Sequence, residues 1–130
     1  MVCSQKVGKF DIVVVQGSDT SDVSFYLLDD DGTPINFSTA TAACHIRSQA
    51  GSSVLLDNLT TENDRISIVE TDVDGVMVWL VTIKFPSIIT SAYNFLSAWY
   101  DFELYMSGKV YRYLEGSVIV NPETTYQNED

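Results

Sequence analysis

The stretch that decides the fold is SAWYDFELYMSGKVYRYL, residues 97–114. Apolar and polar side chains alternate on both sides of Ser107-Gly108, which is typical of two strands joined by a tight turn. A two-residue loop at this point fixes the pairing of the strands and places three pairs of residues opposite each other: Glu103–Arg112, Leu104–Tyr111 and Phe102–Tyr113. The stretch therefore predicts an antiparallel β-hairpin.

This register divides the hairpin into an inner and an outer face. The inner face is expected to hold Tyr100, Phe102, Leu104, Tyr111 and Tyr113. The outer face is expected to hold Trp99, Asp101, Glu103, Tyr105, Val110 and Arg112. A slip by one residue would bury the charge of Arg112 opposite Leu104, so this register is favoured. It leaves aromatic and apolar side chains on the outer face.

Outward from the hairpin, short β-rich runs recur between clusters of Gly, Asp, Asn, Ser and Pro. The other expected strands are Phe10–Gln16, Asp22–Asp29, Ala42–Arg47, Ser53–Asp57, Arg65–Val69, Val76–Phe85 and Ser117–Asn121. Trp79 lies in a run that is apolar on both faces, so we expect it in the core. Only residues 86–95 suggest a helix, of a single turn crossing between sheets. The pattern predicts an all-β antiparallel sandwich of about seven to nine strands.

The length and composition of the chain limit how many domains it can form. The chain has 130 residues, enough for one core without disulfide or metal staples. We expect an N-terminal arm (1–9), a sandwich domain (10–121) and a polar C-terminal tail (122–130). A disulfide between Cys3 and Cys44 is possible, but a buried Cys44 acting as a small hydrophobic residue is favoured.

Charge and hydropathy exclude several classes of partner. The net charge of −11 repels phosphate backbones, so no nucleic acid is expected. The apolar run near the N-terminus is too short for a signal peptide or a membrane span, so neither secretion by the standard route nor a membrane partner is expected.

Two carboxylates on the outer face, Asp101 and Glu103, have a spacing compatible with a glycosidase pair. The favoured interpretation is a solvated face on which Glu103 pairs with Arg112. His45, the only histidine, points away from the core on its strand and lies in no nucleophile motif. No catalytic residue is therefore predicted.

Two acidic turns resemble the start of a calcium loop. Asp72-Val73-Asp74-Gly75 is followed by an apolar strand rather than by further oxygen ligands, and the second turn, residues 29–32, is acidic in the same way. Asp-Gly also makes a turn without any ion. We predict simple turns, with no metal and no cofactor.

The order of the motifs resembles a family of small phage proteins that includes the N-terminal domains of baseplate upper proteins and tail- or fibre-associated virion proteins. The motifs run from Gln16–Thr20, through Leu27–Phe37, Thr41–Arg47 and Thr60–Val69 with Asp74-Gly75, to Ala98–Leu104, Ser107–Val110 and Leu114–Thr125. The chain departs from the family pattern at two places. Where the family usually has Leu-Thr-Gly, this chain has Phe37-Ser38-Thr39, and where it usually has a Pro-Gly turn, this chain has Asn94–Ser97.

The resemblance implies an immunoglobulin-like sandwich without catalytic residues, acting as a structural module of a phage tail, baseplate or fibre attachment. It would be located in the virion, assembled in the host cytoplasm, and would contact other tail or baseplate proteins as part of a homo-oligomer. We expect contact through the outer face of the hairpin, with Trp99, Tyr105, Val110 and Arg112 as interface residues. A surface-glycan-binding module, using Trp99 and the carboxylates, and a capsid decoration protein remain alternatives.

Overall fold

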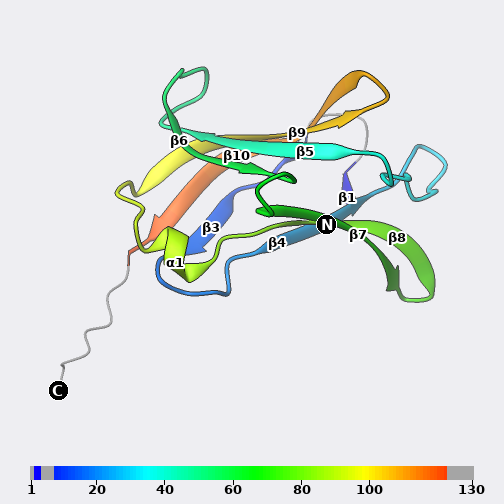
Figure 1. Ribbon diagram of the computed structural model, residues 1–130, viewed down its shortest axis with the longest axis horizontal. Helices are drawn as coiled ribbons and strands as arrows, with labels where there is room; N and C mark the ends of the chain where they lie inside the picture. Colours follow the sequence, from blue (N-terminus) through cyan, green and yellow to red (C-terminus); the bar gives the residue numbers. More distant parts are fainter. Residues whose placement is uncertain (1, 4–7, 123–130) are drawn as a thin grey trace.

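The hairpin consists of β9 (Ser97–Met106) and β10 (Lys109–Asn121) in a computed structural model that describes residues 2–3 and 8–122 (Figure 1). Ser107 and Gly108 have φ angles of 55° and 74°, as a two-residue hairpin turn of this hand requires. The pairs Glu103–Arg112 and Leu104–Tyr111 are confirmed.

The third expected pair of the hairpin is wrong. Phe102 lies opposite Leu114 rather than Tyr113, because a β-bulge shifts the register between Arg112 and Leu114. The bulge lets two consecutive side chains enter the core: Tyr113 is 7% exposed and Leu114 is 1% exposed. A strictly alternating strand would have placed one of them outside.

Two sheets face each other across the core (Figure 1). The four-stranded sheet has the order β1 (Val2–Cys3), β4 (Val23–Leu27), β8 (Val76–Ile83) and β7 (Ile66–Val73). The six-stranded sheet has the order β2 (Gly8–Lys9), β10, β9, β5 (Thr41–Arg47) and β6 (Leu55–Thr60), and β3 (Ile12–Val15) also pairs with β10. The described part of the chain is thus an all-β protein with the two-sheet arrangement of a β-sandwich.

Some boundaries differ from the sequence-based expectation. The two runs expected after the turn form one continuous strand, β10. The expected helical turn is α1 (Ser87–Thr90), in the connection from β8 to β9. Strands β1 and β2 fall within the segment expected to be an N-terminal arm. Of the expected C-terminal tail, residues 123–130 lie outside the described residues.

The core is one cluster with side chains from both sheets. Phe25 of β4 meets Phe102 of β9 edge to face, with ring centroids 5.2 Å apart, a favourable aromatic geometry. Cys44 is fully buried and carries a free thiol, as the favoured interpretation predicted. Burial, followed by the negative charges of Asp101 and Asp57, raises the pKa of that thiol, so it stays protonated as an apolar residue. Trp79 is partly buried and packs against this cluster.

A glycine allows the N-terminal strands to lie against β10. A Cβ at Gly116 would come within 2.3 Å of the carbonyl oxygen of Phe10. The same oxygen accepts a hydrogen bond of 2.6 Å from the hydroxyl of Tyr100. Asp11 adds an acceptor for the backbone N–H of Ser117, at 3.1 Å. Only a residue without a side chain fits at this crossing.

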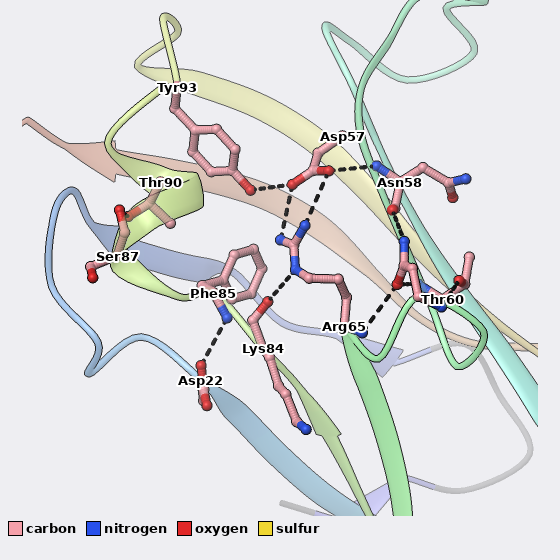
Figure 2. A network of polar contacts seen from close by, with 11 residues as sticks. Asp22, Asp57, Asn58, Thr60, Arg65, Lys84, Phe85, Ser87, Thr90 and Tyr93 are labelled. Atoms are coloured by element: carbon pink, nitrogen blue, oxygen red, sulfur yellow. Dashed lines mark hydrogen bonds and ion pairs between the residues drawn. The ribbon is translucent and has the colours of Figure 1, made fainter.

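A polar network ties the two sheets together at one end of the sandwich (Figure 2). Arg65, at 8% exposure, precedes β7 and donates to both carboxylate oxygens of Asp57 on β6, at 3.4 and 3.0 Å. Its Nε donates to the carbonyl of Lys84 at 3.1 Å. The hydroxyl of Tyr93 donates to Asp57 at 2.6 Å, and the backbone N–H of Asn58 donates at 2.8 Å. Both oxygens of this carboxylate, whose side chain is 16% exposed, are therefore satisfied.

Candidate functional site

A concave feature lies on the outer face of the six-stranded sheet, over β5, β9 and β10. It is a depression of about 580 Å³. We call it the outer-face depression. Its lining residues are His45, Arg47, Ala50, Gly51, Ser52, Trp99, Asp101, Glu103, Arg112 and Glu115. The volume lies within the range of small-molecule sites, whereas the charged lining differs from a typical apolar pocket.

Asp101 occupies the centre of this face, because its neighbours across the sheet are His45 on β5 and Glu115 on β10. Its Oδ2 lies 3.5 Å from Nη1 of Arg47. Its Oδ1 lies 3.8 Å from Nδ1 of His45, beyond hydrogen-bond distance, and has no hydrogen-bond partner although it is buried. One oxygen of this carboxylate therefore keeps an unused acceptor.

Glu103 is held by two side chains. Arg112 donates to Oε2 and the hydroxyl of Tyr105 donates to Oε1, each at 3.0 Å. Burial alone would raise the pKa of Glu103, but the hydrogen bonds from Arg112 and Tyr105, with the charges of Arg112 and His45, lower it below its ordinary value. Glu103 is therefore a fixed, ionised acceptor. A glycosidase general acid needs the opposite shift.

Trp99 forms the aromatic part of the depression. The ammonium of Lys9 lies over the indole, 5.7 Å from its centroid, and pairs with Glu115. The Lys9 side chain is 70% exposed, so solvent competes for this cation–π contact. Arg47, opposite Trp99 on β5, is the next side chain across the sheet. An aromatic surface and paired charges thus share one concavity.

The four expected interface residues share this sheet face but do not form one apolar patch. Trp99 and Tyr105 are separated along β9 by Asp101 and Glu103. Val110, at 59% exposure, lies at the far end of the face. It borders a second concavity of about 410 Å³, the hairpin-tip groove, which is lined by Ile35, Val110, Tyr111, Arg112 and Tyr113.

In each of the two acidic turns, an aspartate side chain accepts hydrogen bonds from backbone N–H groups of the same turn. Asp72 accepts the backbone N–H of Gly75 at 2.8 Å. Asp29 accepts those of Asp31 and Thr33, each at 2.9 Å. Within residues 2–3 and 8–122, no three or more His, Cys, Asp or Glu side chains gather as metal ligands would. Turn formation accounts for both motifs.

The sequence placed Trp99, Asp101, Glu103 and Arg112 on this face, but it indicated neither Glu115 of β10 nor the β5 side of the depression. His45 was correctly expected to point away from the core, yet its position opposite Asp101 depends on the β5–β9 pairing. The same pairing brings Arg47 to Asp101, and the loop after β5 adds Gly51 and Ser52. The only available signal was that two alternating strands each carry charges on their polar face.

Comparisons with known proteins give no further assignment. No family model matches the chain, and no curated protein matches it. Among the residues that the structure describes, no helix has the length and apolar character that crossing a membrane requires.

Proposed function

We propose that the chain is an immunoglobulin-like sandwich serving as a non-enzymatic structural module of a phage tail, baseplate or fibre attachment. The strand order supports the fold. Variable-type immunoglobulin domains pair strands B, E and D in one sheet, and C′, C, F and G in the other. Here β4-β8-β7 faces β6-β5-β9-β10 in the matching order. One departure is that β1 runs parallel to β4.

Core contacts are in keeping with this assignment. Antibody domains join strands B and F by a disulfide. In this chain the corresponding strands, β4 and β9, carry the edge-to-face pair Phe25 and Phe102. An aromatic pair there can hold the sheets together in a reducing compartment such as the host cytoplasm, where disulfides are rare.

The observation that carries the assembly role is the hairpin-tip groove. Val110 is 59% exposed beside the stacked rings of Tyr111 and Tyr113, whose centroids are 6.0 Å apart. Exposed Val110, beside the partly buried ring of Tyr111 and an arginine, gives the groove apolar, aromatic and arginine groups of the kind enriched in protein–protein contacts. The lowered pKa of Glu103 argues against this residue as a general acid, because a carboxylate held ionised by Arg112 is a poor proton donor.

The experiment is incorporation of the chain into particles. Val110→Arg places a bulky charge in the groove and is expected to abolish incorporation while the domain stays folded. Val69→Arg is the matched control, because Val69 is 55% exposed but lies on the other sheet. Crosslinking of the wild-type chain in intact particles identifies the neighbour. Absence of the chain from particles, or equal incorporation of both variants, would overturn the proposal.

A further inference from the structure

We propose that the outer-face depression binds a neutral sugar residue, a function separate from assembly at the hairpin tip. Three features together carry this inference: an aromatic wall, carboxylates already held in place, and a buried acceptor without a partner. They occur within one concavity of about 580 Å³. This volume suits a short saccharide, which needs a shallow polar site rather than a deep apolar one.

The aromatic wall is Trp99. A pyranose ring has one face rich in C–H groups, and such a face packs on an indole while the hydroxyls point sideways to polar groups. Lys9 stands over the indole at 5.7 Å, on a side chain that is 70% exposed. Because that side chain is largely solvated, it can move aside at low cost. The indole is thus accessible to a ligand.

The carboxylates supply acceptors for sugar hydroxyls. Glu103 is oriented by Arg112 and Tyr105, so its geometry is set before a ligand arrives. Asp101 keeps Oδ1 unused and buried beside His45. Because this oxygen is buried, a hydroxyl reaches it only when a neighbouring side chain such as His45 moves, and it then gains a hydrogen bond without displacing one within the protein. Such preorganisation lowers the entropic cost of binding.

Charge selects a neutral sugar over an anionic one. The three carboxylates of the depression and its rim, Asp101, Glu103 and Glu115, are matched by three paired cations, Arg47, Arg112 and Lys9. No excess positive charge among these groups is left to bind a ligand anion, and the net charge of −11 repels anions at longer range. Hydroxyl groups can both donate and accept in such a mixed lining.

The test is an NMR titration of the isotope-labelled full chain. The probes are methyl glycosides of glucose, galactose, mannose, rhamnose and N-acetylglucosamine, with dextran and galactan oligosaccharides, at concentrations of about 10 mM, which detect even weak binding. Sialic acid is the anionic comparison. We expect at least one neutral probe to shift the Trp99 indole signal and the amides of Gly51 and Ser52. No shift from any neutral probe, shifts confined to another surface, or a response to sialic acid alone would overturn the proposal.

Variants separate this site from the assembly surface. Trp99→Ala should weaken binding of the responding sugar at least tenfold, whereas Trp99→Phe keeps an aromatic face and most of the affinity. Val110→Arg, outside the depression, should bind as wild type even if it fails to enter particles. Unchanged sugar affinity in Trp99→Ala would contradict the proposal. So would a Trp99→Ala chain that folds but no longer enters particles, since the depression would then be part of the assembly contact.

Discussion

Two ion networks built from similar side chains behave differently in this molecule. At the end of the sandwich, Asp57 accepts four hydrogen bonds, from Arg65, Tyr93 and Asn58, and the Arg65 side chain is only 10% exposed. In the outer-face depression, Asp101 meets Arg47 at 3.5 Å and leaves one oxygen without a partner. The Arg47 side chain is 26% exposed.

The difference separates a structural contact from a candidate site. A buried ion pair with every group satisfied fixes how the two sheets meet, and breaking it leaves an uncompensated charge. In the outer-face depression the cations are more exposed, 26% for the Arg47 side chain and 49% for that of Arg112, so water competes for their contacts and these ion pairs contribute less to stability. The exposed groups of the depression remain able to bind a ligand.

Removing the buried arginine should have the largest effect. Arg65→Met leaves the Asp57 carboxylate partly buried without its cation, so we expect a loss of about 3–5 kcal/mol in the free energy of unfolding. The matched variant Arg112→Met removes an arginine whose side chain is 49% exposed, and should cost less than about 1 kcal/mol. Urea denaturation of both variants measures this. Equal losses would show that the two networks do not differ.

The buried network should also weaken in alkali. Burial and the hydrogen bond to Asp57 raise the pKa of Tyr93, so the folded state holds this proton more tightly than the unfolded state. The resulting stability is complete below the ordinary tyrosine pKa of about 10 and is lost as the pH rises above it. Tyr93→Phe should cost about 1 kcal/mol at neutral pH and flatten the fall in stability above pH 10. An unchanged alkaline slope would mean that other groups dominate.

The contribution of the outer-face network to stability should fall in acid rather than in alkali, and the change should be smaller than for the buried network. The pKa of Glu103 is lowered from 4.5, so its contribution is present above that value and is lost as the pH falls through the lowered pKa. Glu103→Gln should therefore lose part of the acid dependence of unfolding and little stability at pH 7. We would measure thermal melting between about pH 2 and pH 7. A large loss of stability at neutral pH would contradict a minor structural role.

Local patterns in the sequence predict much of the fold. Alternation and the Ser107-Gly108 turn predicted the hairpin, and Glu103 faces Arg112 as expected. The bulge at Tyr113 was missed because two adjacent apolar residues, Tyr113 and Leu114, fit either an alternating strand or a bulge. Short strands such as β2 carry too few residues to show a period.

The candidate site was only half predictable. Trp99, Asp101, Glu103 and Arg112 follow from one hairpin register, which depends on a local turn. Glu115 does not, because it reaches this face only through the bulge between Arg112 and Leu114. The contribution of His45 and Arg47 depends on the pairing of β5 with β9, whose residues are more than fifty positions apart in the chain. Nothing in the sequence indicated that Arg65 is buried, since its partner Asp57, and Tyr93, which also bonds to Asp57, belong to separate segments. Long-range pairing is the step that local periodicity leaves open.

The most direct test is the same isosteric change in both networks, Asp57→Asn and Asp101→Asn, with the free energy of unfolding measured at pH 7. Asp57→Asn removes the charge that compensates buried Arg65, so the account predicts a loss of about 3 kcal/mol or more. Asp101→Asn removes a carboxylate with an unsatisfied oxygen and a long contact to Arg47, so the predicted change is within about 1 kcal/mol. If Asp101→Asn destabilises the chain as much as Asp57→Asn does, the depression is a structural element and the distinction between the two networks is wrong.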